Sequence, residues 1–396
     1  MPKESFFDAA AFRQSRPVLL TTFTNKVGSI GLSLIPILLV KRGVSTAQGT
    51  LVLSTLKATI IVGTLAGGAL SDRFSSRSLT LAALLMSAAG LGFLPFQTTI
   101  LLILIFGIIA QFAEALLNVV QRVLLMDQVD SAHQKEALGW MRMVANFAQI
   151  FSYSIAAAAS TLGVAPLMVL DAATSFVAFL LGRKILPRKS AHPDPDRGLT
   201  VGKDGVFASK AAFFGCSLVL MGWSFFYELF LEGGAGRLEI LHPGEGLRRF
   251  STMMILNTVI CTLAAVHAAR FFHKAWIAIT CGMALTAFGI LVAGWGMSSQ
   301  IWVFSGMFFI TLGELMLGAV AQYTLMRMTP GIAKAGLYYS VGLTVMQCGR
   351  IAGAALAFPL LIHATSLVPF TAVVVGVLAL QLVVLLALRG DVERLA

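Results

Sequence analysis

The chain has 396 residues, of which 57% are hydrophobic and only 12% are charged. A soluble domain carries about 25% charged residues, and a water-soluble protein this apolar would expose large patches and aggregate. The composition therefore excludes an ordinary soluble protein. The formal charge of +11 is better explained by loops beside a membrane than by nucleic-acid binding.

Apolar segments long enough to cross a bilayer, about 20 residues each, follow one another along the chain. The first follows a polar start of mixed charge, so we expect a span and not a cleaved signal peptide. The pattern predicts an all-α polytopic membrane protein with twelve transmembrane helices, at residues 17–40, 48–71, 78–96, 98–122, 138–162, 165–182, 211–231, 251–272, 276–297, 301–326, 336–361 and 366–388.

The longest polar segment lies between the sixth and seventh spans and is rich in Pro, Gly and charge. It divides the chain into a six-helix bundle at 1–183, a linker at 184–210 and a second six-helix bundle at 211–396. The halves repeat weakly, because Glu114 and Glu314 are 200 residues apart and Gln149 and Gln347 are 198 apart. Related halves are how many transporters build a site at the middle of the membrane.

Lys and Arg are distributed unevenly between the two sides of this topology. The side with both termini and the linker has 20 of the 29 basic residues, the opposite side has 5, and 4 lie within spans. Because positive charge collects in cytoplasmic loops, both termini are expected in the cytoplasm. We expect a multi-pass protein of a bacterial-type inner (plasma) membrane, acting as a monomer.

The loop after the second span contains Gly68, Asp72, Arg73 and Arg77 in the order Gly-Ala-Leu-Ser-Asp-Arg-Phe-Ser-Ser-Arg. It resembles the signature loop of the major facilitator superfamily, with two serines in place of a glycine and a basic residue. The resemblance implies that the loop is a latch between the halves on the cytoplasmic side. There the acidic residue faces a helix start, and the basic residues hold neighbouring helices.

Two further segments are similar to the drug and metabolite exporters of that superfamily. They are residues 170–176, Leu-Asp-Ala-Ala-Thr-Ser-Phe, and residues 312–315, Leu-Gly-Glu-Leu. The glycine-proline motif that antiporters commonly have in the fifth span is absent, since that segment reads Ser-Ile-Ala-Ala-Ala-Ala-Ser. This departure weakens the assignment to drug/proton antiport.

Charged side chains inside spans are costly, so they face the protein interior and usually have a partner. Lys26 and Glu114 lie at a common depth of roughly 12–14 Å, at about 1.5 Å per residue. The resemblance places the first and fourth spans along the transport cavity, which makes this pair plausible. Glu314 and Arg350 agree in depth within about one turn. Lys57 has no evident partner and is a candidate contact for an anionic group of the substrate.

Other polar side chains within spans have two interpretations. Asn25, Asn118 and Gln347 are candidate substrate contacts, or they join helices through hydrogen bonds. Asp171 is expected to be satisfied by neighbouring backbone or hydroxyl groups. Arg142 lies a few residues into the fifth span, close enough to reach the cytoplasmic interface.

The sequence favours a transporter over an enzyme, since it has no catalytic triad, no metal-ligand cluster and no nucleotide-binding loop. We expect no cofactor and no nucleic-acid partner, and a proton gradient as the energy source. The first hypothesis is an exporter of a small amphipathic organic compound, such as a drug, an antibiotic or a metal-chelating metabolite, with Glu114 and Glu314 coupling protons. The second is an importer or facilitator of an anionic nutrient or siderophore, with Lys26, Lys57 and Arg350 as anion contacts. A third is a membrane receptor that has lost transport.

Overall fold

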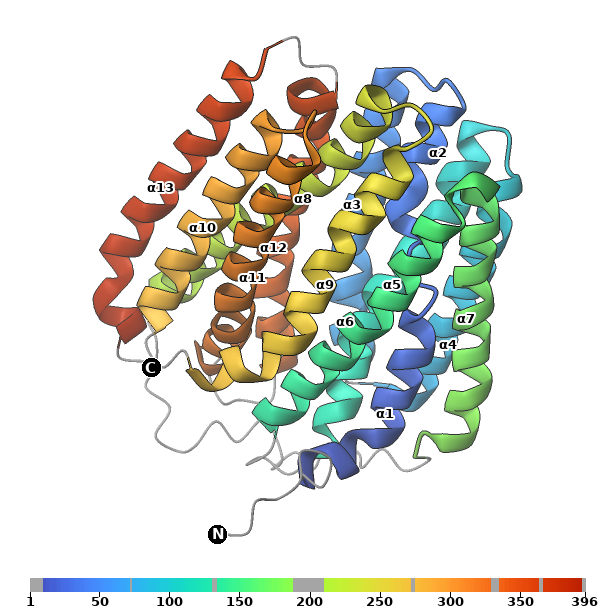
Figure 1. Cartoon of the computed structure of the whole chain (residues 1–396). Helices are drawn as coiled ribbons and strands as arrows, with labels where there is room; N and C mark the ends of the chain where they lie inside the picture. The colour runs from blue at the N-terminus through green and yellow to red at the C-terminus, as the bar shows by residue number, and fades with distance from the viewer. Residues whose placement is uncertain are drawn as a thin grey trace.

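The computed structural model describes residues 10–71, 73–129, 134–187, 210–271, 275–328, 335–362 and 366–393. All regular structure in these ranges is helical (Figure 1). The N-terminal half, α1 to α7, comprises α1 (Ala10–Lys26), α2 (Ile35–Lys41), α3 (Thr46–Ser71), α4 (Ser76–Phe93), α5 (Ile100–Met126), α6 (Gln134–Ala158) and α7 (Val164–Ile185). The C-terminal half comprises α8 (Lys210–Leu241), α9 (Gly246–Phe271), α10 (Ala275–Trp295), α11 (Gln300–Met328), α12 (Ala335–Ala357) and α13 (Val368–Glu393).

The prediction of an all-α membrane protein is confirmed, and most helix ends lie within a few residues of the predicted spans. The first span differs, because it is broken between α1 and α2 and passes through a short 3₁₀ helix at Gly31–Leu34. The seventh also differs, because α8 continues to Leu241 and does not end at 231. Three acidic or basic residues expected in a loop, Glu232, Arg237 and Glu239, therefore lie in a helix.

Several helices begin where the sequence supplies a capping residue. Ser75 precedes α4, and its side chain accepts a hydrogen bond from the Ser78 amide. Thr99 precedes α5 and accepts a hydrogen bond from the Leu102 amide in the same way. Such caps satisfy backbone N–H groups that the first helical turn leaves unpaired.

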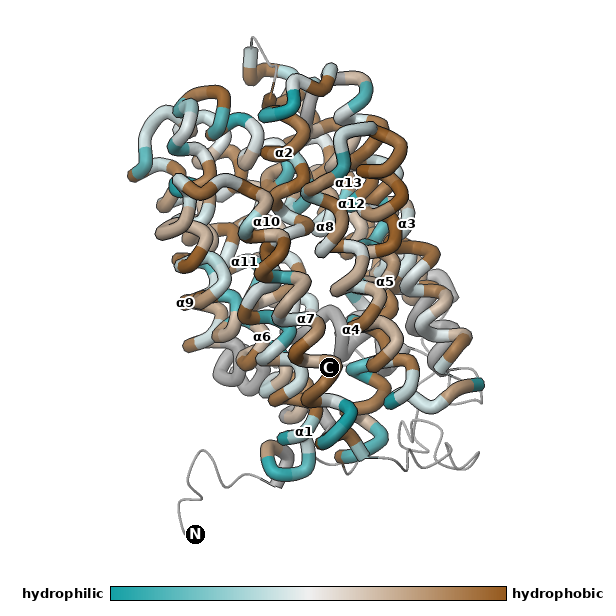
Figure 2. The backbone as a smooth tube through the Cα atoms, turned by 90° about the vertical axis from the view of Figure 1, so that its right-hand side faces the viewer, coloured by the Kyte–Doolittle hydropathy of each residue, from teal (hydrophilic) through white to brown (hydrophobic). Residues whose placement is uncertain are grey.

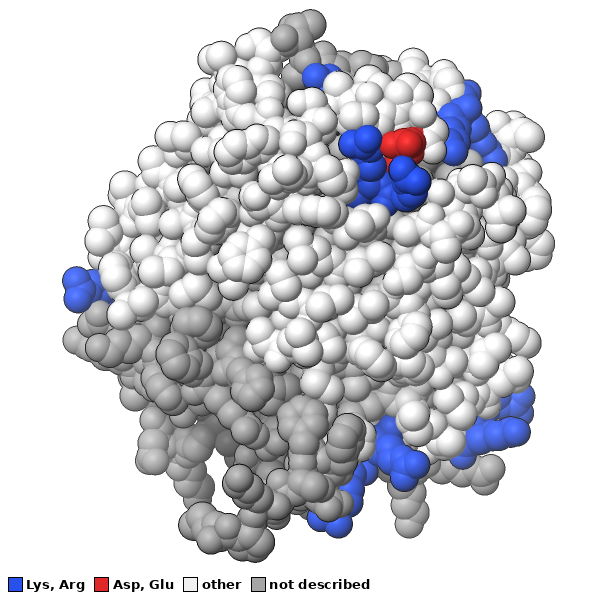
Figure 3. Space-filling view, in the orientation of Figure 1, with Lys and Arg blue, Asp and Glu red and all other residues white. Residues whose placement is uncertain are grey.

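Helix α1 begins and helix α13 ends on one side of the molecule (Figure 1), here called the terminal side, and the opposite side is called the far side. Charged residues are placed as a membrane requires. In Figure 3 most of the Lys, Arg, Asp and Glu atoms lie towards the two ends, one basic group lies at the left edge at mid-height, and the described residues at the centre of this face are uncharged. The backbone in Figure 2 is likewise mostly brown along the helices, with teal concentrated towards the two ends.

Nine segments in the described ranges are long and apolar enough to cross a membrane by composition. The helix α6 does not meet that criterion, and the described part of α12, Val341–Ala357, is a shorter apolar segment. The two halves meet through pairs of helices, since α6 packs on α9 and α12 packs on α3. At such a contact with protein, polar side chains of α6 can find partners that lipid does not offer.

The largest apolar cluster includes residues of both halves and lies mainly towards the far side. In the N-terminal half it includes Ile37 and Leu39 of α2, and in the C-terminal half it includes Phe230 and Leu238 of α8. The helices α2 and α8 are in contact. Burial of these side chains holds the halves together near their far-side ends.

Candidate functional site

Lys26 and Glu114 form an ion pair in the N-terminal half, as the sequence predicts. Lys26 is the last residue of α1, and Glu114 lies in the middle of α5. The two side chains are only 12% and 16% exposed, so water screens the pair weakly. Asn118, one turn further along α5, donates a hydrogen bond to Glu114 Oε1 at 3.3 Å. The predicted residues Lys26, Glu114 and Asn118 therefore lie together.

Asn25, the neighbour of Lys26, has a different environment. It is buried, and its Oδ1 accepts a hydrogen bond from Ser175 Oγ of α7 at 2.9 Å. Asn25 thus joins two helices of the same half, which is one of the two roles predicted for it.

The break between α1 and α2 depends on Asp171 of α7. The Gly31 amide donates a hydrogen bond to Asp171 Oδ2 at 2.8 Å, which satisfies a backbone group freed by the break. A Cβ at Gly28 would lie 2.3 Å from Thr174 Oγ1, so α7 approaches the broken turn closely. The expectation that backbone satisfies Asp171 is confirmed.

Lys57 of α3 is the centre of a second charged cluster, which lies between the halves. Its Nζ contacts Glu228 Oε1 and lies 2.7 Å from Glu232 Oε1, and both carboxylates belong to α8. Arg350 of α12 lies on the other side of Glu228, with 3.6 Å between Arg350 Nε and Glu228 Oε2. We call Lys57, Glu228, Glu232 and Arg350 the inter-half cluster. The prediction that Lys57 lacks a partner is wrong.

The inter-half cluster contains two carboxylates, Glu228 and Glu232, that are not among the predicted site residues. Their side chains are 4% and 8% exposed. The predicted seventh span ends at 231, which places Glu232 in a loop, whereas the residue lies in α8. The available signal was a pair of Glu residues four apart in a long apolar helix, a spacing that puts both on one face.

Glu314 of α11 has a different partner from the one predicted. Its Oε1 lies 3.0 Å from Arg142 Nη2 of α6, and its Oε2 accepts a hydrogen bond from Asn257 Nδ2 of α9 at 3.0 Å. The expected pairing of Glu314 with Arg350 is therefore wrong, since depth along a helix does not specify which side it faces. Arg142 extends across to the other half and not to the membrane interface.

Gly318 makes room for this second contact between the halves. It lies four residues after Glu314 on α11, and a Cβ built on it would be 1.7 Å from Arg142 Nη1. The guanidinium group therefore rests directly on the α11 backbone. A larger residue at 318 would displace it.

Gln347 of α12, one turn before Arg350, is 8% exposed, and its Oε1 has no hydrogen-bond partner among the described residues. The Nε of Arg350 is also buried and makes no hydrogen bond with them, and its contact with Glu228 Oε2 at 3.6 Å is an ion pair. Buried polar atoms without a hydrogen bond are uncommon and call for an explanation. Gln347 lies beside the inter-half cluster, on the helix that contacts α3 and α8.

The loop proposed as a latch is described only in part. Asp72 lies outside the described residues, while Gly68 is buried at the end of α3 and Arg73 is exposed. Arg77 donates hydrogen bonds to the carbonyl oxygens of Leu186 and Arg183, at 3.1 and 2.9 Å. It therefore holds the end of α7 against α4, as expected for a basic residue of this loop. The latch between halves stays a prediction.

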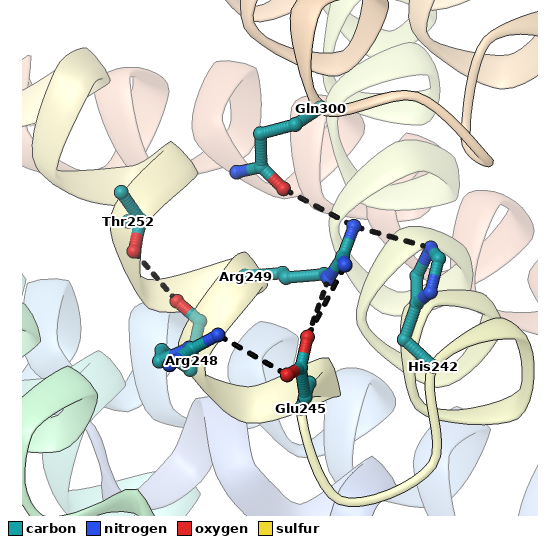
Figure 4. Close-up of polar contacts among 6 residues, drawn as sticks. All are labelled: His242, Glu245, Arg248, Arg249, Thr252 and Gln300. Carbon is teal, nitrogen blue, oxygen red and sulfur yellow. Dashed lines mark hydrogen bonds and ion pairs between the residues drawn. The ribbon is translucent and has the colours of Figure 1, made fainter.

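A polar cluster on the far side fixes the turn between α8 and α9 (Figure 4). Arg249 bonds Glu245 at 3.1 Å and reaches His242 and Gln300, at 3.3 and 3.5 Å. Among the described residues, the Arg248 side chain bonds only Glu245, at 3.2 Å, and it is 59% exposed. Arg249 thus ties the α8–α9 turn to the start of α11.

Comparisons with known proteins agree with this architecture. The family model for the Major Facilitator Superfamily matches residues 18–354. A crystal structure of the peptide transporter POT in complex with sulfate has a TM-score of 0.74 and 15% identity, covering 100% of this chain and 97% of that one. No curated protein sequence matches the chain.

Other solved transporters have the same fold at low identity. The xylose transporter XylE from E. coli gives a TM-score of 0.70 at 10% identity, covering 96% of this chain and 98% of that one. The human organic anion transporter MFSD10 gives 0.69 at 14% identity, covering 95% and 99%. At such identities the likeness concerns the fold alone. The family match covers most of the chain, so the protein belongs to the Major Facilitator Superfamily and is a secondary transporter.

Proposed function

We propose that this transporter exports a small amphipathic organic compound by proton-coupled alternating access. It would act as a monomer in a bacterial-type inner membrane, with both termini in the cytoplasm. The 20-to-5 distribution of basic residues supports this orientation. The segments 170–176 and 312–315, which are similar to those of exporters, support the direction and the type of substrate.

The observation that carries proton coupling is the pairing of charges inside the membrane. Lys26, Lys57, Arg142 and Arg350 each lie within 4 Å of a carboxylate oxygen. Carboxylates are the groups that can bind and release a proton, and in membranes they mark proton pathways. Glu114 and Glu314 occupy equivalent positions in the two halves, each fourteen residues after the first residue of its helix.

The same observation disfavours import of an anionic nutrient. That hypothesis needs Lys26, Lys57 and Arg350 as free positive charges that bind the anion. Each already faces a glutamate, and Lys57 faces two. An anion would have to displace these carboxylates before it could bind.

Transport into inverted membrane vesicles tests the proposal with ethidium, a fluorescent amphipathic cation, as the probe. We expect ethidium to accumulate in the vesicles when a proton gradient is imposed and to leave when the gradient is collapsed. Glu314→Gln should abolish gradient-driven accumulation. Glu245→Gln, which changes an exposed carboxylate on the far side, is the control and should transport normally.

Uptake of anions by right-side-out vesicles, with no response to the gradient, would support the importer instead. Failure of every compound in an amphipathic panel to move in either orientation would support the receptor hypothesis.

A further inference from the structure

The inter-half cluster divides unequally between the two halves. Lys57 belongs to α3 of the N-terminal half, whereas Glu228, Glu232 and Arg350 belong to α8 and α12 of the C-terminal half. The helices α8 and α12 pack closely, since a Cβ at Gly349 would lie 1.9 Å from the Met221 carbonyl oxygen. When the halves move apart as units, Arg350 therefore stays with the carboxylates and Lys57 leaves them.

The two carboxylates differ in what remains after Lys57 leaves. Oε1 of Glu228 contacts Lys57, and its Oε2 lies 3.6 Å from Arg350 Nε. Glu232 contacts Lys57 at 2.7 Å and has no other cationic partner among the described residues. Separation of the halves leaves Glu228 with a positive charge beside it and Glu232 with none.

An ionised carboxylate without a partner is costly inside a membrane protein. A proton removes that cost by neutralising the carboxylate, and an ammonium group reduces it by pairing with the charge. Lys57 and a proton are therefore alternative occupants of Glu232, and each makes binding of the other less favourable.

We propose that Glu232 is a proton-binding site whose proton competes with Lys57, so that protonation loosens the contact between the halves on the far side. The inference rests on the proton coupling proposed above and adds a carboxylate to it. Glu228 is the positioning residue, which keeps Arg350 beside α8 and receives Lys57 when the halves close again.

The location of the inter-half cluster indicates which side of the protein opens when the halves separate. Glu232 is nine residues before the end of α8, or about 14 Å from the far-side end at 1.5 Å per residue. The apolar contact between α2 and α8 lies on the same side. Loss of the Lys57–Glu232 pair therefore weakens the far-side closure.

Other charges near α8 do not replace Lys57. Helix α10 has no charged residue, and the charges of α13 lie in its last turns. Helix α11 contributes Glu314, which Arg142 engages. Helices α2 and α9 carry their described charges at their far-side ends, and on α8 itself Arg237 bonds the Ile362 carbonyl oxygen at 3.0 Å.

Spin-label distances in lipid nanodiscs test the inference without a substrate. One label pair, Ala47→Cys with Leu241→Cys, spans the halves on the far side. A second pair, Arg13→Cys with Gly390→Cys, spans the terminal side. Both are made in a chain whose native cysteines are replaced, at Cys216, Cys261, Cys281 and Cys348.

In the otherwise unchanged chain, the far-side distance should lengthen as the pH falls from about 8 to about 5, a range in which perturbed carboxylates titrate. Glu232→Gln should give the long distance at both pH values. Glu232→Asp, which can still bind a proton, should restore the response. Glu239→Gln changes another buried glutamate of α8 and should keep the response of the unchanged chain.

A pH response that persists unchanged in Glu232→Gln would overturn the proposal, as would a far-side distance that ignores pH in the unchanged chain. The vesicle assay separates this failure from failure of the proposed function. If transport is driven by protons but the far-side label distance does not depend on pH, the role of Glu232 is rejected and the proposed function stands. If the far-side label distance depends on pH but transport is not driven by protons, the proposed proton coupling is rejected and Glu232 remains a proton-binding site.

Discussion

Two ion pairs deep in the membrane differ in what they join. Lys26 and Glu114 belong to α1 and α5, within the N-terminal half. Lys57 and its two glutamates join α3 to α8, across the halves. In a transporter that alternates its access by moving its halves, the first pair can remain intact throughout the cycle while the second must break. The Lys26–Glu114 pair thus contributes to the stability of one half, whereas Lys57 and its glutamates affect the equilibrium between conformations.

We expect the greatest loss of stability when the Lys26–Glu114 pair of the N-terminal half is broken. Lys26→Met and Glu114→Gln should each reduce stability by about 3–5 kcal/mol, because each leaves an uncompensated buried charge. The double variant should recover part of the loss. Thermal unfolding in detergent, together with folded yield, measures both effects.

Additive losses would show that the two side chains do not interact in the folded protein. The far-side label distance supplies the matching control. It should be the same in the double variant and in the unchanged chain, because this pair does not join the halves.

Replacing Gly318 should reduce stability less than breaking the Lys26–Glu114 pair, and it should change the conformational equilibrium more. In Gly318→Ala the new Cβ displaces the Arg142 guanidinium, which can rotate away but then loses Glu314. We expect a stability loss of about 1–3 kcal/mol, typical of added volume in a packed interior. The equilibrium between the two access states should shift, as label distances on both sides of the membrane would report.

Phe308→Ala changes an exposed side chain of α11 and controls for a general effect of substitution on this helix. Equal label distances in Gly318→Ala and the unchanged chain would mean that Arg142 does not hold the halves together.

The two neighbouring arginines of the turn between α8 and α9 should show the least change in stability when they are replaced. Arg248 is exposed and pairs with Glu245 alone in the part of the chain that the structure describes, so Arg248→Ala should change stability by about 0–1 kcal/mol. Arg249→Ala should cost more, because Arg249 also contacts His242 and Gln300 (Figure 4). Thermal unfolding of the two single variants at low and high salt measures the difference. Equal effects would show that the contact with the start of α11 adds nothing.

Hydropathy predicts most of the fold because lipid imposes a length and a composition on each crossing. It fails at the end of α8, where Glu232, Gly233 and Gly234 resemble a loop but lie in a helix covered by other helices. It also fails at the break in the first crossing, because the partner of that break, Asp171, is distant in sequence.

The candidate site is predicted less completely, for a geometric reason. Depth along a helix can be read from the sequence, and it paired Lys26 with Glu114 correctly. Depth does not specify the direction in which a side chain points. Depth therefore indicated Arg350 as the partner of Glu314, whereas the packing of α6 against α9 brings Arg142 to it instead.

The hydrogen bond from the Gly31 amide to Asp171 has a consequence for how the chain is made. The two residues are 140 positions apart, so the ribosome delivers the first crossing long before α7 can satisfy its broken turn. An unpaired backbone group in lipid costs several kcal/mol. During synthesis, the first crossing must therefore wait in a polar environment, such as an insertion machinery or an interfacial position, or form a continuous helix that breaks later. Assembly of the N-terminal half is completed only when its last helix arrives.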